Sequence, residues 1–444
     1  MVVVQLPDRY VDSMDPFGEV RSLAETAGAM IVGELMQKRD KPRGKTFLGK
    51  GRVEDLTALV QSTGATLVIF DCDLSPAQIR ELEQIVRCKV IDRSELILDI
   101  FANRATTAAA KLQVEIAQLE YTYPRLRAMW SHLEQIVGGA PVGIGTRGPG
   151  EKQIEIDRRL VSNRLKKLRQ DLREIQMRKT REVESRRLDF FTVGLVGYTN
   201  AGKSTLFNRL TRGGAFADPK LFATLATRVE RWELGGGNAA MLSDTVGFIR
   251  DLPHHLVASF RSTLEETILA HTLIIVLDVS DRNATMQLKT VHETLDAIGA
   301  TTQPRLIVLN KSDLIADRRD LLLWLNRYPQ AMVVSAATGD GCPALTEAVK
   351  EEMLGSIREV QVQAPAADGR SITLIEQRTQ VLDRQYLNGE ARFTVRLGRR
   401  QIDHLLAQGA RFRINGLSPM DAIQKLWDGP PPRPAPRVPP HLQP

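Results

Sequence analysis

The segment Gly197-Tyr-Thr-Asn-Ala-Gly-Lys-Ser204 has the spacing of a loop that binds nucleotide phosphates. An apolar, strand-like run at residues 190–196 precedes it, and a helix-like run at 205–210 follows it. The glycines let backbone N–H groups turn toward phosphate oxygens, and the helix N-terminus adds partial positive charge. We expect Lys203 to reach the β- and γ-phosphates and the Ser204 hydroxyl to bind Mg²⁺. The predicted phosphate contacts are Gly197, Tyr198, Thr199, Asn200, Ala201, Gly202, Lys203, Ser204 and Thr205.

A second pattern, Asn310-Lys-Ser-Asp313, ends the apolar run at residues 306–309. A carboxylate placed there can accept two hydrogen bonds from the N1–H and 2-amino edge of guanine. Adenine offers no such pair of donors, so Asp313 predicts selection of guanine. We expect Asn310 to brace the neighbouring loops and the Lys311 side chain to lie along the plane of the base.

The dipeptide Ser335-Ala336 follows a third apolar run, at residues 332–334. In the matching motif of GTPases, the N–H of Ala336 reaches O6 of guanine. Taken alone, each of these short patterns is common on protein surfaces. Because they occur in this order, each at the end of a predicted strand, they favour GTP over ATP as the nucleotide.

Between the phosphate and guanine motifs lies Asp244-Thr-Val-Gly247. We expect Asp244 to hold Mg²⁺ through water and the N–H of Gly247 to sense the γ-phosphate. Upstream, Thr224 offers a second hydroxyl for Mg²⁺ on a loop that would order only with the γ-phosphate present, and Thr227 is an alternative for this role. The predicted contacts here are Phe222, Ala223, Thr224, Asp244, Thr245, Val246 and Gly247. The predicted Mg²⁺ ligands are Ser204 and Thr224, and the predicted catalytic residues are Lys203, Thr224 and Gly247.

Hydrolysis of GTP requires a water molecule in line with the γ-phosphate. Many GTPases place a glutamine directly after the Asp-x-x-Gly motif, but this chain has Phe248 there. A phenyl ring cannot hydrogen-bond water, so we expect a low intrinsic rate and completion of the site by a large partner. His254 and His255 are candidate bases, although such a pair at a helix start is more often solvated or packed.

The composition is that of an ordinary globular chain, with 444 residues of which 43% are hydrophobic and 25% charged. This length predicts about three domains. The three cysteines are far apart and show no disulfide or metal spacing, which suits a reducing cytosol. The amino-terminal apolar stretch is too short for a signal sequence, and without an apolar run of about 18 residues we expect no membrane span.

The formal charge of +7 is concentrated in one segment. Between residues 157 and 187 there are twelve basic and five acidic side chains, which equals the excess of the whole chain. A basic segment on a neutral body predicts a nucleic-acid surface. The alternative is the solvated face of a coiled coil.

Hydrophobic periodicity predicts a small α/β domain at residues 1–105, followed by an antiparallel helical hairpin at 106–187. The first domain alternates helices and strands in a parallel arrangement. Two heptad-like seams predict the hairpin, with a kink at Pro124 and a glycine-rich tip loop at 138–150. The strands expected in the first domain lie at 29–35, 67–70 and 89–91, and the helices at 52–61 and 76–86.

The remaining parts begin with residues 188–357, where alternating strands and helices predict an α/β fold, the doubly wound sheet of a P-loop GTPase. Its expected helices include 258–270, 286–298 and 343–354. Residues 358–428 predict a small α+β domain with a hairpin at Asn388-Gly389. Residues 429–444 are rich in proline and predict a disordered tail.

Taken together, the nucleotide motifs resemble those of translation-factor-like GTPases, and a longer match is to the HflX family. The segment 143–153 with Asp157-Arg-Arg159 resembles the glycine-rich signature of that family, and segments 221–225 and 244–253 resemble its two switch regions. The likeness covers residues 20–358 well. Two departures are Ala226-Thr227, where the family usually has Asp-Pro, and Lys152, where threonine is usual.

The resemblance implies a cytoplasmic, Mg²⁺-dependent GTPase that binds the large ribosomal subunit and its rRNA and separates stalled or idle ribosomes under stress. We expect a monomer that contacts RNA through the hairpin, and peripheral membrane association stays open. A role in ribosome assembly or RNA remodelling is the alternative. A metabolic P-loop kinase with an RNA-binding appendage is a third hypothesis, which Asp313 argues against.

Overall fold

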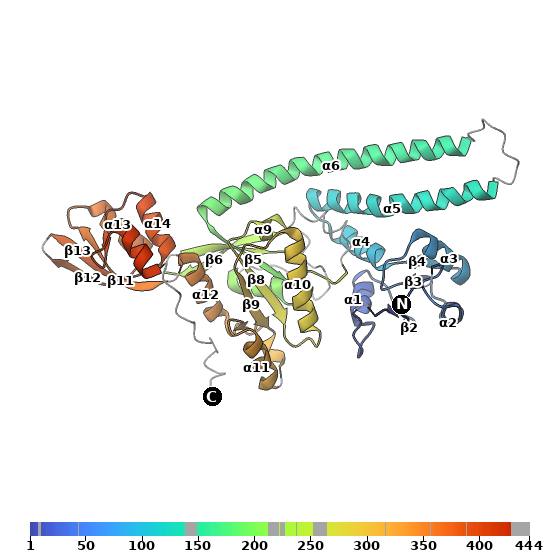
Figure 1. Ribbon diagram of the computed structural model, residues 1–444, viewed down its shortest axis with the longest axis horizontal. Helices are drawn as coiled ribbons and strands as arrows, with labels where there is room; N and C mark the ends of the chain where they lie inside the picture. Colours follow the sequence, from blue (N-terminus) through green and yellow to red (C-terminus); the bar gives the residue numbers. More distant parts are fainter. Residues whose placement is uncertain are drawn as a thin grey trace.

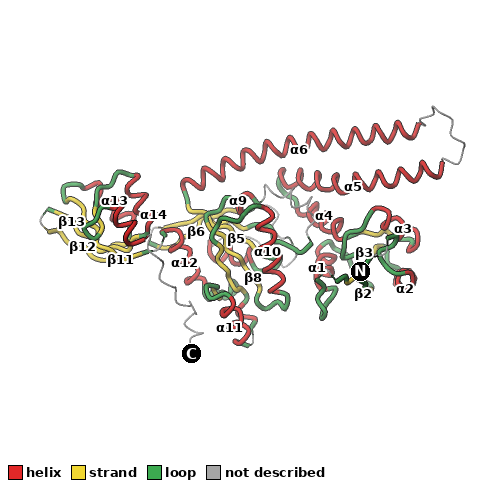
Figure 2. Tube along the Cα trace, viewed as in Figure 1, coloured by secondary structure: helices red, strands yellow, loops and turns green. Residues whose placement is uncertain are grey.

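The computed structural model shows three globular units in a row, with a long helical hairpin lying beside two of them (Figure 1). The unit at the amino terminus and the unit at the carboxy terminus flank a central sheet, and Figure 2 shows where strands alternate with helices. The structure describes residues 1–7, 10–42, 44–137, 149–211, 222, 227–236, 238–251, 264–315, 317–355, 357–387 and 389–427, without the side chains of 124–158, 185–189 and 318.

The amino-terminal unit is a small α/β domain in which every described strand pair is parallel. Strand β1 pairs with β2, β3 pairs with β4, and a single bridge from Val2 to Phe70 joins the two pairs. Its elements are β1 (Val2–Gln5), α1 (Gly18–Thr26), β2 (Leu35–Lys38), α2 (Lys50–Thr63), β3 (Leu67–Ile69), α3 (Pro76–Val86), β4 (Lys89–Ile91) and α4 (Arg93–Arg104).

The prediction of a strand at 29–35 is wrong, because only Leu35 of that run belongs to a strand. The register pairs Val2 with Leu35, and β1 begins at Val2, so residues 29–34 have no ladder partner. The other expected elements are confirmed within one to two residues. Helix α3 begins with a complete capping box at Ser75 and has Pro76 in its first turn.

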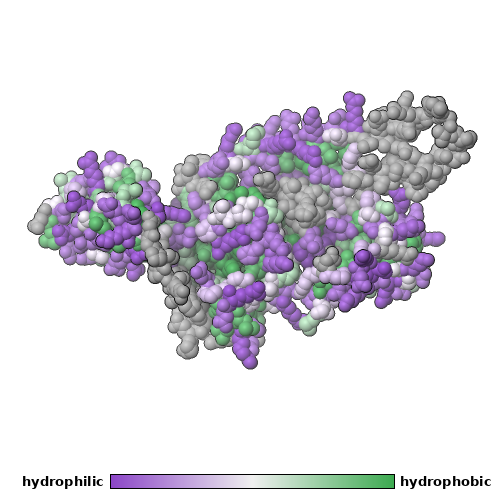
Figure 3. Space-filling view, viewed as in Figure 1, coloured by the Kyte–Doolittle hydropathy of each residue, from purple (hydrophilic) through white to green (hydrophobic). Residues whose placement is uncertain are grey.

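The hairpin consists of α5 (Ala108–Val137) and α6 (Pro149–Asp189). Leucines at 165, 168 and 172 pack against Ile116 to form an apolar seam. Helix α5 continues past Pro124, and α6 already begins at Pro149, so the predicted loop was two residues too long. Residues 138–148 of that loop lie outside the described part of the chain. Hydrophilic side chains stand along α6 in the space-filling view (Figure 3).

The central unit has a six-stranded sheet in the order β10-β9-β8-β5-β7-β6, in which β6 alone is antiparallel to its neighbour. This confirms the doubly wound P-loop fold. Its elements are β5 (Phe191–Gly197), α7 (Lys203–Thr211), β6 (Arg228–Gly235), β7 (Asn238–Asp244), α9 (Glu265–Ile268), β8 (Thr272–Asp278), α10 (Ala284–Ile298), β9 (Arg305–Asn310), η1 (Ser312–Leu314), α11 (Arg318–Arg327), β10 (Met332–Val333) and α12 (Cys342–Leu354).

The carboxy-terminal unit is a four-stranded antiparallel sheet in the order β12-β13-β11-β14, with a β-α-β-β-α-β chain path. Gly398 fits against Leu354 of α12, where a Cβ would lie 2.1 Å from the Leu354 carbonyl oxygen. Its elements are β11 (Arg358–Pro365), α13 (Gly369–Arg378), β12 (Gln380–Leu387), β13 (Glu390–Leu397), α14 (Arg399–Ala407), β14 (Arg413–Ile414), α15 (Pro419–Ala422) and η2 (Ile423–Trp427).

Two further expectations concern segments that lie wholly or partly outside the described residues. Within the predicted helix at 258–270, the described residues contribute α9 only, and the tail at 429–444 lies outside the described part of the chain. Across the helices that the structure describes, none combines the length and apolar character needed to cross a bilayer.

Candidate nucleotide site

The phosphate loop connects the end of β5 at Gly197 to the start of α7 at Lys203. Gly202 has a φ of +92°, and a Cβ on it would lie 2.3 Å from the side-chain nitrogen of Asn310. Any larger residue would therefore push away either the loop or Asn310. The loop thus presents its backbone amides at the N-terminus of α7, the geometry that binds anions.

Lys203 is buried, with 6% of its surface exposed. Its Nζ donates hydrogen bonds to the carbonyl oxygens of Tyr198 at 2.7 Å and Gly197 at 3.2 Å. Burial lowers the pKa of Lys203 to about 8, although the Asp244 carboxylate acts in the opposite direction. An ammonium group held in so dry a place is stabilised by any anion that enters the loop.

Ser204 and Asp244 lie side by side because β7 runs next to β5 in the sheet, with Leu195 opposite Asp244. The Ser204 Oγ donates to Asp244 Oδ2 at 2.7 Å. A hydroxyl and a carboxylate are hard oxygen ligands of the kind that Mg²⁺ prefers, and Mg²⁺ takes few protein ligands beside phosphates and water. The donor set therefore fits Mg²⁺. No cluster of three or more His, Cys, Asp or Glu side chains competes for a metal in the part of the chain that the structure describes.

Asn310, at the end of β9, joins the phosphate loop to the loop after β10. Its side-chain nitrogen donates to Ala201 O at 2.8 Å, and its oxygen accepts from Ala336 N at 2.9 Å. The N–H expected to reach guanine O6 thus already has an acceptor, which a bound base would have to share. Asp313 accepts from Ser335 Oγ at 2.6 Å, so the two predicted base motifs are in direct contact.

Lys311 has a φ of +61°, and its side chain reaches the end of β8. There its Nζ lies 2.7 Å from Asp278 Oδ2. Since the ion pair anchors the ammonium end, the aliphatic part of the side chain is held at a fixed place beside the Asn310 loop.

The segment after β7 is hydrogen-bonded to the phosphate loop. Phe248 N donates to Gly197 O at 3.0 Å, and Thr199 N donates to Phe248 O at 2.8 Å. Thr245 Oγ1 donates to Leu195 O at 2.7 Å within the sheet. Gly247 packs so closely here that a Cβ on it would lie 2.9 Å from Thr199 and 3.0 Å from Lys203 Nζ.

Most of the predicted nucleotide residues therefore converge at the carboxyl ends of β5, β7 and β9. Phe222 is buried in the apolar core that also holds Tyr198 and Val246, and its ring lies 4.6 Å from that of Phe101 in α4. Ala223 and Thr224 lie outside the described residues, as do His254 and His255, so their predicted roles stay predictions. Thr205 is exposed on α7.

Arg209 is a contributor that sequence reasoning missed. From α7 it donates Nε to the carbonyl oxygen of Ala336 at 3.2 Å and Nη2 to that of Ala337. It thereby ties the helix of the phosphate loop to the loop of the base. Its position in the sequence carries no signal for this, since arginine is common on exposed helix faces.

A parallel sheet whose first strand ends in this phosphate loop, with Asp244 beside it and the Asn310 and Ser335 loops at the next strand ends, defines the P-loop GTPases. Three sequence models of protein families match the chain. They are described as GTP-binding GTPase N-terminal at residues 15–102, GTP-binding GTPase Middle Region at 104–186, and 50S ribosome-binding GTPase at 192–311.

The GTPase HflX of Escherichia coli strain K12 is 42% identical over 359 residues, which is 80% of this chain and 83% of the relative. That of Spirochaeta thermophila is 44% identical over 337 residues, covering 76% of this chain and 81% of the relative. The chain belongs to the HflX family of GTPases and hydrolyses GTP. A solved structure described as a complex of SsGBP with GDP aligns at a TM-score of 0.45 and 24% identity, over 79% of this chain and 98% of the other.

Proposed function

We propose that this GTPase binds the large ribosomal subunit in its GTP form, promotes separation of stalled or idle ribosomes under stress, and leaves after hydrolysis. The observation that carries the proposal is the basic hairpin fixed to the amino-terminal domain beside a GTPase domain. The family description of residues 192–311 as a 50S ribosome-binding GTPase supports this partner. A monomer working in the cytoplasm suits this role.

At the nucleotide, each residue has a role that follows from its contacts. Lys203 would exchange its two carbonyl acceptors for phosphate oxygens, and the Gly247 N–H would meet the γ-phosphate. Ser204 would hold Mg²⁺ directly and Asp244 through water, with Thr224 as the second hydroxyl. Bound Mg²⁺ would neutralise phosphate charge. Asp313 would accept from the guanine edge, and its bond with Ser335 Oγ orients it for that.

Phe248 supports a low intrinsic rate of hydrolysis. Its ring is buried, with 3% exposed, in the core between the sheet and α10, and both its backbone polar groups bond to the phosphate loop. The side chain therefore has no polar group with which to orient a water molecule, so we expect the ribosome to supply or induce what is missing.

The outer face of α6 is the surface proposed to meet RNA. Lys166, Lys167 and Arg173 are exposed. In contrast, Arg164 and Arg169 form ion pairs with carboxylates of α5, at 2.7 Å and 2.6 Å respectively. Part of the positive excess read from the sequence is thus neutralised within the hairpin. Lys166, Lys167 and Arg173 are therefore a better test of RNA binding than the two paired arginines.

The experiment compares Lys166→Gln/Lys167→Gln/Arg173→Gln with a matched control in which three exposed amino-terminal lysines, at 41, 45 and 50, become glutamine. Binding to purified 50S subunits and the GTPase rate are measured at several salt concentrations. The hairpin variant should bind more weakly, and the slope of log affinity against log salt should flatten by about two, since each lost phosphate contact removes roughly 0.7 to 0.9. Its GTPase rate without ribosomes should be unchanged.

The control variant should keep both the affinity and the slope of the unmodified protein. An unchanged slope in the hairpin variant would show that its charge is only solvated. A GTPase rate that 50S subunits do not raise would contradict the proposed partner. Sedimentation of 70S ribosomes with the protein and a GTP analogue tests separation itself, since the proposal requires free subunits to appear.

A further inference from the structure

The apolar core of the amino-terminal domain includes residues of the nucleotide site. Tyr198 from the phosphate loop, Phe222 from the first switch, and Val246 and Ile249 from the second are buried in one cluster with that domain. The same cluster continues into the start of α5, at Ala110, Val114 and Ala117. The segments that must respond to the nucleotide are therefore packed into the domain that carries the hairpin.

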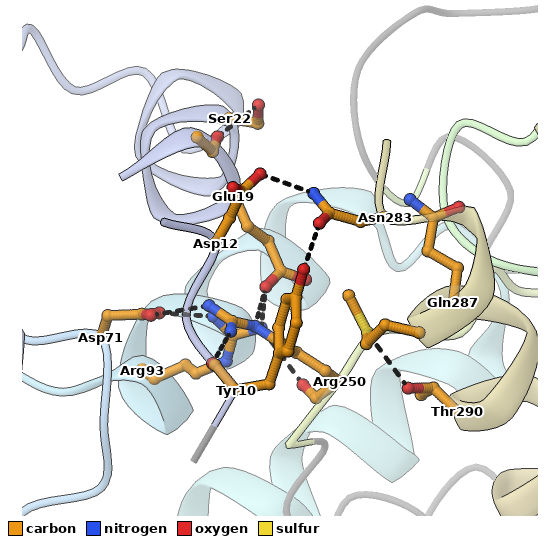
Figure 4. A network of polar contacts seen from close by, with 12 residues as sticks. Tyr10, Asp12, Glu19, Ser22, Asp71, Arg93, Arg250, Asn283, Gln287 and Thr290 are labelled. Atoms are coloured by element: carbon orange, nitrogen blue, oxygen red, sulfur yellow. Dashed lines mark hydrogen bonds and ion pairs between the residues drawn. The ribbon is translucent and has the colours of Figure 1, made fainter. Parts of the chain in front are cut away.

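A ring of four charges, three of them buried, lies on this core, and we call Glu19, Asp71, Arg93 and Arg250 the charge ring (Figure 4). Arg250 donates Nη2 to Asp71 at 2.9 Å and Nε to Glu19. Arg93 donates Nη1 to Asp71, and its Nη2 lies 3.3 Å from Glu19. Cations and carboxylates thus alternate, and three of the four members come from the amino-terminal domain.

Arg250 is held at its backbone as well as its side chain. Its carbonyl oxygen accepts from Arg93 Nη2 at 3.1 Å, and its N–H donates to Tyr198 Oη at 3.0 Å. Tyr198 Oη in turn donates to Glu19. Around the ring, Arg250 Nη1 donates to the Tyr10 carbonyl. The backbone of residue 250 is therefore set by the amino-terminal domain and the phosphate loop together.

Three of the ring members are too buried to lose a charged partner without consequence. Arg93 and Asp71 expose 1% and 2% of their side chains, and Arg250 exposes 10%. Burial by itself lowers the pKa of Arg93, but the charges of Glu19 and Asp71 outweigh it and raise that pKa above its ordinary value. A buried ion without its counter-ion is strongly disfavoured, so the ring holds only when the two domains dock in this one arrangement.

Gly247 lies three residues before Arg250, in the stretch pressed against Thr199 and Lys203. Phe248 between them is fixed to Gly197 and Thr199 through both its backbone groups. A displacement of Arg250 would therefore also displace the segment that includes Gly247. A catalytic or sensing N–H must be placed within a fraction of an ångström to contribute fully.

We infer that Glu19, Asp71 and Arg93 are positioning residues that hold the N–H of Gly247 at the γ-phosphate through Arg250, so that the amino-terminal domain sets the preference for GTP over GDP. The inference rests on the proposed contact between Gly247 and the γ-phosphate. It adds that the selectivity of the GTPase domain depends on residues outside that domain.

The test uses the full-length protein and measures the dissociation constants of GDP and a non-hydrolysable GTP analogue, the GTPase rate, and thermal unfolding. Asp71→Asn and Arg250→Met should weaken binding of the GTP analogue at least tenfold while changing GDP affinity less than about twofold. The loss of a hydrogen bond to a charged group typically changes an equilibrium constant by about that factor. Arg93→Lys keeps the charge without the forked donor, so it should give an intermediate loss.

Tyr198→Phe is the decisive variant if the charge variants fail to fold. It removes one hydroxyl, which joins Glu19 to Arg250 N, and leaves every charge in place. It should lower the GTP/GDP affinity ratio several-fold. The matched control is Arg21→Gln, which breaks an exposed ion pair with Asp15 and Glu34 inside the amino-terminal domain and should leave the ratio unchanged.

Gly247→Ala separates failure of this inference from failure of the proposed site. If Gly247→Ala leaves the GTP/GDP ratio unchanged, the assignment of Gly247 is wrong. If Gly247→Ala lowers the ratio but the ring variants and Tyr198→Phe do not, the inference alone is overturned. Parallel losses of GDP and GTP affinity in the ring variants would also overturn it, because a general loosening of the fold acts on both nucleotides.

Discussion

The buried ammonium group of Lys203 makes nucleotide affinity depend on pH in a range where most lysines do not titrate. In the free protein burial lowers the pKa of Lys203 to about 8, well below the ordinary value of 10.5. Phosphate oxygens favour the charged form, so this pKa must rise when nucleotide binds. Binding above about pH 8 therefore takes up a proton, and affinity must fall as the pH increases.

The size of the effect follows from the fraction of Lys203 that is already charged. With a pKa of about 8, roughly nine tenths of the free protein is protonated at about pH 7 and roughly one tenth at about pH 9. The dissociation constant of GDP should therefore increase about tenfold over that interval, which is about 1.4 kcal/mol. Below about pH 7 the contribution of Lys203 should level off, because nearly all of it is then protonated.

The assay is titration of a fluorescent GDP analogue at constant Mg²⁺ and ionic strength, so that no hydrolysis of the γ-phosphate occurs during the measurement. Lys203→Arg is the matched control, because arginine stays charged throughout, and the β-phosphate and the guanine base titrate equally in both experiments. The difference between the two curves isolates Lys203. A flat curve for the unmodified protein, or equal slopes in both proteins, would refute the reasoning.

Three further predictions concern the base, its loop and the hairpin. Asp313→Asn should weaken GTP binding by roughly 2 to 4 kcal/mol, because the amide places a hydrogen-bond donor opposite the donors of guanine. Xanthosine triphosphate should recover part of the lost affinity. An unchanged affinity for GTP would refute the assignment of Asp313 to guanine. Arg209→Gln should weaken the binding of guanine nucleotides about three- to tenfold, as measured by GDP titration, because the Ala336 loop loses a hydrogen bond that holds it. The affinity for inosine diphosphate should fall by the same factor. An unchanged GDP affinity would show that Arg209 does not hold the loop in place. Leu168 is 2% exposed, and Leu168→Ala should destabilise the hairpin by roughly 2 to 4 kcal/mol. Amide hydrogen exchange should become faster in α5 and α6 and stay unchanged in the central sheet. Unchanged exchange in the hairpin would show that the apolar seam does not stabilise it.

Sequence reasoning succeeded where neighbouring residues build the feature. The phosphate loop is one contiguous segment, and its glycines, lysine and serine act through local backbone geometry. The apolar seams of α5 and α6 repeat at helical spacing, so their pairing was also readable. It failed for residues 29–34, where the apolar pattern of a strand is present but the partner strand is not.

A count of charged residues in the sequence does not show which of them form ion pairs in the fold. The basic excess of residues 157–187 was visible in the sequence, but the pairing of Arg164 with Glu115 and of Arg169 with Glu120 was not. The paired residues are 49 positions apart, so only the packing of α6 against α5 shows which cations are already paired.

The sequence by itself determined the class of nucleotide, the doubly wound sheet and the existence of a basic arm, because each depends on residues that are adjacent or regularly spaced. Only the tertiary structure decided what surrounds the switch segments. The charge ring joins Glu19 to Arg250 across 231 positions, and no local pattern marks its members. These four residues meet only when the two domains dock. Each charge would be costly to bury alone, and it is stable there because its neighbours in the ring carry the opposite charge.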